Sequence, residues 1–201
     1  MILYPENSKQ VYTLPRDSVD QLWEVFNLAE KQIKILERDE GDGLDIASVN
    51  ELRYVAFHLL KSMTTASTVD ELKKATNHAH RALFDAHEAQ TIDILSKINK
   101  FFYDYRLVDI KAGLPDFVLK KAEVISLKAK IEEFPQGDDR QESYRQIAEV
   151  NNRLIQIANE FEASRHVLNV QMTEKATATR RWFIGIGVAI CMAIVGLFLK
   201  K

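Results

Sequence analysis

Four of the five histidines fall in one stretch of the chain, residues 58 to 87. Histidine is the side chain whose ordinary pKa lies closest to neutral pH, so it moves protons readily there. Arg53 precedes His58 by five positions, and Arg81 precedes His87 by six. Arginine stabilises phosphate charge while histidine transfers protons, and the two together suit RNA cleavage. The sequence therefore offers Arg81, His87, Arg53 and His58 as candidate catalytic residues.

The same residues also fit structural roles. Arg81 and Asp85 are spaced for an i,i+4 salt bridge on a solvated helix face, and His80 and His87 fit beside a packed stripe. On a straight helix, residues five or six apart point about 140° or 120° away from one another. A shared site on one helix therefore needs a helix break or a second subunit. No carboxylate-histidine spacing predicts a metal site, and we expect no cofactor.

An uncharged segment of eighteen residues runs from Trp182 to Leu199. As a helix it would be about 27 Å long, close to the thickness of a bilayer core. Two arginines precede it and two lysines follow it, and an aromatic pair begins it. The segment predicts a single-pass transmembrane helix near the C-terminus, with the lipid bilayer as a partner. We expect a tail-anchored membrane protein with a cytoplasmic soluble domain.

Small residues recur along this segment. Gly185, Ala189 and Ala193 follow a small-xxx-small pattern, and Gly196 lies near the same face. This spacing favours self-association into a homo-oligomer. The alternative is that Gly and Ala are simply common in membrane helices.

The composition narrows the other possible functions. The chain has 27 Lys and Arg against 29 Asp and Glu, so bulk attraction to nucleic acid is not expected. Cys191 is the only cysteine, which excludes an intrachain disulfide and a thiol-based metal cluster. No motif for a small-molecule substrate stands out.

Apolar residues at three- and four-residue steps predict an all-α fold. The helix signals predict five helices: from Asp17 or Ser18 to near Gly41, from Ser48, from Thr68, from beyond Pro115 to near Phe134, and from near Asp138 to near Leu199. The third carries an alanine stripe suited to tight helix packing or a subunit contact. We expect a cytosolic bundle over 1–137, a stalk over 138–181 and a membrane helix over 182–199. A juxtamembrane hinge at Thr173 to Thr179 is the competing view of the stalk.

The Arg-x4-His string from Arg53 to His58 and the Arg-x5-His string from Arg81 to His87, in an all-helical domain, resemble the signature of the HEPN superfamily. In that superfamily, Arg-x4-6-His motifs from two protomers form a ribonuclease site. The resemblance implies that role for Arg53 and His58, or for Arg81 and His87. The chain departs from the common form because Tyr54 and Ala82 follow the arginines where a polar residue is usual.

The whole architecture resembles the small membrane-anchored, HEPN-like accessory proteins of type VI-B, RNA-targeting CRISPR systems. That resemblance implies a helical effector that oligomerises and permeabilises the membrane as a pore in antiviral defence. It also implies an RNA-guided effector complex, or RNA, as a partner. The alternatives are a membrane-tethered HEPN ribonuclease and a tail-anchored scaffold or adaptor. Of these functions, we favour a non-enzymatic protein over a ribonuclease.

Overall fold

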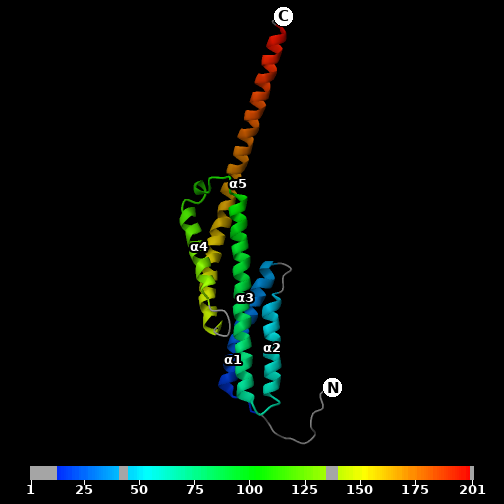
Figure 1. Cartoon of the computed structure of the whole chain (residues 1–201), viewed down its shortest axis with the longest axis vertical. Helices are drawn as coiled ribbons and strands as arrows, with labels where there is room; N and C mark the ends of the chain where they lie inside the picture. Colours follow the sequence, from blue (N-terminus) through cyan, green and yellow to red (C-terminus); the bar gives the residue numbers. More distant parts are fainter. Residues whose placement is uncertain (1–12, 41–44, 135–139, 200–201) are drawn as a thin grey trace, which may run out of the picture. The chain divides into compact units, whose positions relative to one another are not determined.

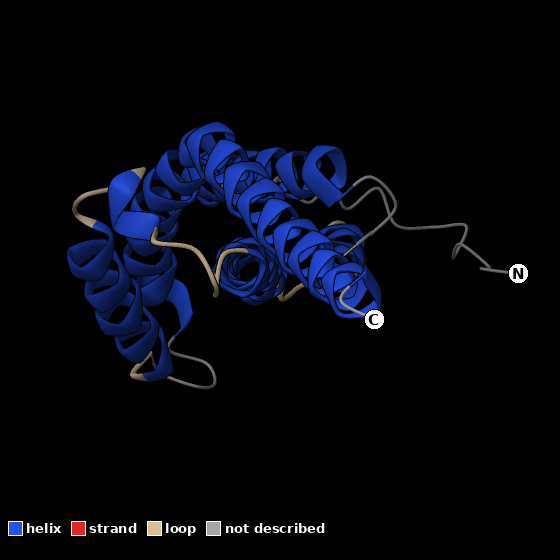
Figure 2. Cartoon of the chain, turned by 90° about the horizontal axis from the view of Figure 1, so that it is seen from above, coloured by secondary structure: helices blue, strands red, loops and turns tan. Residues whose placement is uncertain are grey.

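The computed structural model describes residues 13–40, 45–134 and 140–199, with only the backbone described for 39–40, 140–142 and 193–199. The described residues are helical with connecting turns and contain no strand, which confirms the predicted all-α class (Figures 1 and 2). The elements are α1 (Arg16–Glu40), α2 (Ile46–Ser62), α3 (Thr68–Asp104), the short 3-10 helix η1 (Ile110–Ala112), α4 (Phe117–Glu132) and α5 (Arg140–Leu199).

The helices begin close to the predicted positions, but the capping residues differ. Helix α2 is capped by Asp45, whose carboxylate accepts a hydrogen bond from the Ser48 backbone N–H at 3.2 Å. The expected start at Ser48 is therefore wrong by three residues, because an aspartate cap lies one turn earlier. Helix α3 begins at Thr68 as predicted, and the Ser67 carbonyl accepts its first hydrogen bond, from the Glu71 N–H at 3.1 Å.

The chain forms two compact units. The first contains α1, α2 and the parts of α3, α4 and α5 that fall within residues 1–96 and 126–155. The second contains the rest, Lys97–Ile125 and the chain from Gln156 onward. Helices α3, α4 and α5 each contribute residues to both units.

The first unit packs α1 and α2 against the alanine stripe of α3. Ala75, Ala79, Ala82 and Ala86 are completely buried. They belong to three apolar clusters that combine side chains of α1 with α3, and in the largest cluster also Val55 of α2. Alanine leaves no bulk between neighbouring helices, so their backbones can approach closely. Of the two roles predicted for the alanine stripe, the structure shows helix packing within the chain.

The second unit has an aromatic core. The Phe101 and Phe161 rings stack with centroids 4.8 Å apart and planes 9° apart, and Phe102 and Phe117 meet edge to face at 5.7 Å. Tyr105 tilts against Phe101 at 4.9 Å. Offset and edge-to-face rings of this kind add to the stability gained from burial. They fix α3, α4 and α5 together within this unit.

Helix α5 is one uninterrupted helix of 60 residues, which confirms the predicted long C-terminal helix. It continues through Thr173 to Thr179, so the alternative of a hinge there is wrong. Its first half is not a free stalk, because it buries apolar residues from Ile147 to Leu168 in the two units. From Met172 to Met192 every side chain is exposed. Within the described residues, no helix has an apolar stretch long enough to cross a membrane.

Candidate functional site

Two of the predicted site residues lie on α2, where His58 takes part in a reciprocal pair of contacts with α3. His58 Nδ1 lies 2.7 Å from Glu71 Oε2, and His78 Nδ1 of α3 lies 2.6 Å from Glu51 Oε2 of α2. The two imidazole rings stack with centroids 5.1 Å apart and planes 15° apart. Each helix therefore gives one histidine and one carboxylate to the same polar cluster.

Aromatic and cationic groups extend this cluster along α2. The Tyr54 ring stacks on His78 at 5.2 Å, and the Arg53 guanidinium lies 5.1 Å from the Tyr54 ring centroid. Arg53 is exposed and lies above the tyrosine, so it does not reach His58 directly. The predicted pair of Arg53 and His58 is thus separated by Tyr54 and His78.

Glu71 is the centre of the charges in this region. Its buried carboxylate lies 2.8 Å from Lys74 Nζ and 3.2 Å from Lys61 Nζ, in addition to its contact with His58. Hydrogen bonds from Lys74 and His58, and the nearby Lys61 charge, lower the pKa of Glu71 to about 2. A carboxylate held this firmly in its charged form is a structural anchor and a poor proton donor.

The second predicted pair lies on α3, where His87 faces the first half of α5. The Asn151 amide donates to the His87 carbonyl at 2.7 Å, and Asn151 Oδ1 accepts from the Thr91 hydroxyl at 2.6 Å. Burial lowers the pKa of His87 to about 4, with a smaller opposite effect from Gln90. His87 Nδ1 is buried and has no hydrogen-bond partner among the described residues. His87 is therefore neutral near pH 7, and its side chain is partly buried.

Both Arg-His strings lie inside uninterrupted helices, α2 and α3. The five- and six-residue spacings therefore keep each arginine and its histidine on different sides of their helix. The structure brings His58 together with His78 across α2 and α3, and it places His87 against α5. A ribonuclease site built from these strings would need a second copy of the chain, and that role stays a prediction.

Sequence reasoning missed the carboxylates and the amide that organise these histidines. Glu51 and His78 are 27 positions apart, and Asn151 is 64 positions from His87. No local spacing signals such contacts. Only the Glu71 and Lys74 pair, three positions apart on one helix, follows a recognisable pattern. In the described part of the chain, no group of three or more metal-ligating side chains could hold a metal ion.

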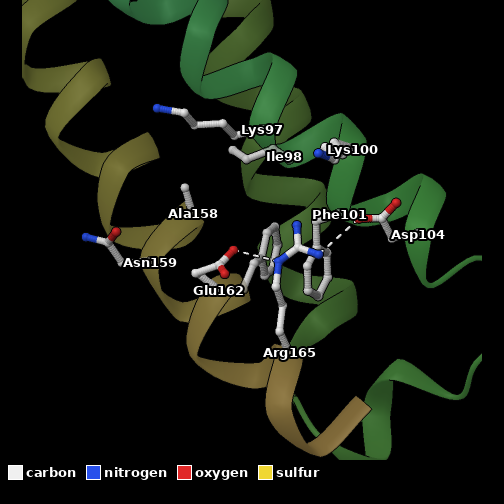
Figure 3. A pocket seen from close by; sticks show the side chains of 10 residues that line it. Lys97, Ile98, Lys100, Phe101, Asp104, Ala158, Asn159, Glu162 and Arg165 are labelled. Atoms are coloured by element: carbon white, nitrogen blue, oxygen red, sulfur yellow. Dashed lines mark hydrogen bonds and ion pairs between the residues drawn. The ribbon is translucent and has the colours of Figure 1, made fainter. Parts of the chain in front are cut away.

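The second unit contains an open pocket of about 580 Å³ between α3 and α5 (Figure 3). Arg165 points into it, with Nη1 3.0 Å from Asp104 and Nε 2.6 Å from Glu162. Partial burial acts to lower the pKa of Arg165, but hydrogen bonds to these two carboxylates raise it overall. The guanidinium also lies 5.5 Å from the Phe101 ring. This arrangement ties α5 to α3 and places no histidine in the pocket.

The exposed half of α5 holds the predicted self-association residues. Gly185 and Ala189 lie on the helix, and a side chain added at Gly185 would meet no atom within 4 Å. The side chains of the other two predicted positions, Ala193 and Gly196, lie outside the described residues. From Met172 to Met192, where the side chains of this half are described, they are exposed.

Comparisons with protein-family models, with curated proteins and with solved structures find no match to this chain.

Proposed function

We propose that this chain is a membrane-anchored helical effector whose C-terminal helix enters a bilayer and associates with further copies of itself. One observation carries the proposal. Seven large apolar side chains of α5, from Trp182 to Met192, are exposed, and the least exposed of them, Ile186, is still 38% accessible. These seven side chains point in all directions around the helix axis, so the segment has no separate apolar and polar faces.

An apolar helix exposed on all sides is unfavourable in water. Burying a side chain of this size contributes about 1.5 to 3 kcal/mol, so the seven together represent on the order of 10 kcal/mol. A helix that is apolar all round is found inside a large core or inside a membrane. The uncharged sequence continues from Ala193 to Leu199, which extends the run to eighteen residues. A bilayer is the environment that fits this segment best.

Self-association is supported by the small residues of the same segment. A side chain added at Gly185 or at Gly187 meets nothing within 4 Å, so both glycines present open backbone. In membranes, helices approach one another where small residues line the contact. The segment has no ionisable side chain, so one copy offers no polar path across the bilayer. Several copies would be needed to make the membrane leaky. The resemblance to the accessory proteins of RNA-targeting CRISPR systems is our reason for proposing that such leakage serves antiviral defence.

The test compares the full chain with a variant that ends at Thr179. Light scattering in mild detergent should give a discrete multiple of the monomer mass for the full chain and a lower mass for the shortened variant. The full chain alone should float with lipid vesicles and release a trapped dye. Failure of the full chain to float would refute membrane anchoring.

A matched pair of substitutions separates insertion from assembly. Gly185→Leu blocks close approach on the small-residue face, and Gly187→Leu adds the same volume about 160° away on the helix. We expect Gly185→Leu to reduce the assembled mass and the dye release while flotation persists. Gly187→Leu should behave like the unchanged chain. Equal effects of both substitutions, or a monomer for the unchanged chain, would leave a tethered scaffold as the function.

A further inference from the structure

The two units carry opposite formal charge. Residues 1–96 and 126–155 contain 15 Lys and Arg against 22 Asp and Glu, a charge of -7. Residues 97–125 and 156–201 contain 12 against 7, a charge of +5. The overall charge of -2 therefore conceals a basic unit. The exposed apolar segment belongs to this basic unit.

Three cations lie within the seven residues that precede the apolar segment. Lys175, Arg180 and Arg181 are exposed, and within the described residues none of them forms an ion pair. Glu174 is the one acidic residue between Asn169 and the end of the sequence. Among the described residues, the positive charge at this level of α5 is therefore almost uncompensated.

The neighbouring threonine hydroxyls are occupied by the helix itself. Thr173 donates to the Asn169 carbonyl at 2.6 Å, and Thr179 donates to the Lys175 carbonyl at 2.9 Å. Such back-bonding turns a hydroxyl toward its own helix. The cations are consequently the polar groups at this level that remain available to an external acceptor.

The three cations surround the helix instead of forming a stripe. At 100° per residue, Arg180 and Arg181 lie about 140° and 240° around the axis from Lys175. Along the axis, Lys175 lies about 10 Å before Trp182, within reach of a lipid headgroup layer for a long, flexible side chain. Trp182 and Phe183, 62% and 63% exposed, follow directly, where an interfacial aromatic pair belongs.

We propose that Lys175, Arg180 and Arg181 form a binding collar for the headgroups of anionic phospholipids. Arginine pairs with phosphate through two parallel hydrogen bonds, and lysine adds a compact charge. A collar all around the helix suits lipids that surround it on every side. When copies assemble, the anionic headgroups also offset the repulsion between collars. This inference rests on the proposed insertion of α5.

The experiment uses the full chain with Trp23→Phe, which leaves Trp182 as its single tryptophan. The protein is reconstituted in vesicles of phosphatidylcholine and phosphatidylglycerol in which one lipid or the other carries brominated acyl chains. Bromine quenches tryptophan fluorescence on contact, so quenching reports which lipid surrounds Trp182. Each cation near a membrane surface favours anionic lipid by roughly fivefold at low salt, so phosphatidylglycerol should quench well beyond its mole fraction.

Charge removal at the collar should abolish this preference. Lys175→Gln with Arg180→Gln and Arg181→Gln should bring quenching back to the mole fraction of each lipid. Raising the salt should weaken the preference of the unchanged collar. The matched control removes three exposed cations of the first unit, Lys31→Gln, Arg38→Gln and Lys73→Gln, and should keep the preference.

The outcomes separate this inference from the proposed function. Quenching by both lipids strictly in proportion to their amounts would refute the collar and leave membrane insertion standing. No quenching by either brominated lipid would show that Trp182 is not in the bilayer and would refute the proposed function itself. A preference that survives removal of the three cations would assign lipid selection to another part of the chain.

Discussion

The two halves of α5 share one helix but have opposite surroundings. From Ser143 to Leu168, buried residues recur at three- and four-residue steps and include polar side chains such as Asn151 and Ser164. From Met172 to Met192 no residue is buried, although the sequence becomes more apolar. In α5, apolar character alone therefore does not predict that a side chain is buried. Periodic apolar positions mark packing inside the units, whereas the continuous apolar run is exposed where it is described, and lipid and further copies of the chain would cover it under the proposed function.

The largest expected difference between the two halves of α5 comes from the same isoleucine-to-alanine substitution made in each. Ile157 is completely buried, whereas Ile190 is 55% exposed. Ile157→Ala should lower the free energy of unfolding of the helical units by about 2 to 5 kcal/mol, because it removes buried methyl groups and leaves a cavity. Ile190→Ala should leave that free energy unchanged. Urea unfolding followed by circular dichroism measures both.

Similar losses for the two variants would contradict the comparison, because they would show that the exposed half supports the fold of the units. A loss at Ile157 alone would leave the exposed half with a role outside folding.

Acid should weaken the contact between the packed half of α5 and α3. His87 has an ordinary pKa near 6.5 when unfolded and about 4 when folded, because burial disfavours its charged form. Below pH 6.5 the unfolded chain therefore takes up a proton that the folded chain does not. Stability falls between pH 6.5 and 4, by up to about 3 kcal/mol, and this contribution stays constant above pH 6.5.

His87→Gln should remove that part of the pH dependence, measured as the unfolding free energy at pH 7 and at pH 4.5. The exposed His166 of α5 provides the control, and His166→Gln should follow the unchanged chain. Glu71 contributes in a lower range, because its pKa of about 2 means that its stabilisation is lost only as the pH falls from about 4.5 toward 2. A pH dependence between 6.5 and 4 that is the same in all three proteins would refute the assignment to His87.

The smallest effect concerns the polar stretch that joins the two halves. Thr177 donates to the Thr173 carbonyl at 2.5 Å and has no other described contact. Thr177→Ala should stabilise the helical conformation of this stretch by a few tenths of a kcal/mol, because alanine is the better helix former. The unfolding of the units should not change. Amide hydrogen exchange at residues 173–181 measures the local effect, and slower exchange in the units as well would argue against it.

The helices themselves could be predicted because their signals are local. The apolar period from Ile147 to Leu168 can be read from neighbouring residues alone, and so can the absence of Gly and Pro from Asp138 to Ile184. The start of α2 was predicted three residues late because two capping signals compete there. Asp45 and Ser48 are both good caps, and the aspartate carboxylate accepts the backbone bond.

The surroundings of the candidate histidines could not be predicted, because they depend on residues far apart in the sequence. The loose Arg-x4-6-His pattern singled out His58 and His87 but carried no information on Glu71 as the partner of His58 or Asn151 beside His87. The alanine stripe of α3 by itself fits both packing inside the chain and a contact with another subunit. Only the positions of α1 and α2 decide between these two, and neither is encoded in the stripe itself.

The continuity of α5 has a mechanical consequence. Asn151 and the exposed segment belong to the same helix, α5, and no loop separates them. The backbone hydrogen bonds of that helix therefore connect the two regions. Rotation of the helix at its packed end would be passed along the rod as torque, without a joint to absorb it. A slip of one helical turn there would displace the far end by about 5.4 Å. Any event that repacks the first half of α5 would thus move the exposed C-terminal segment as well.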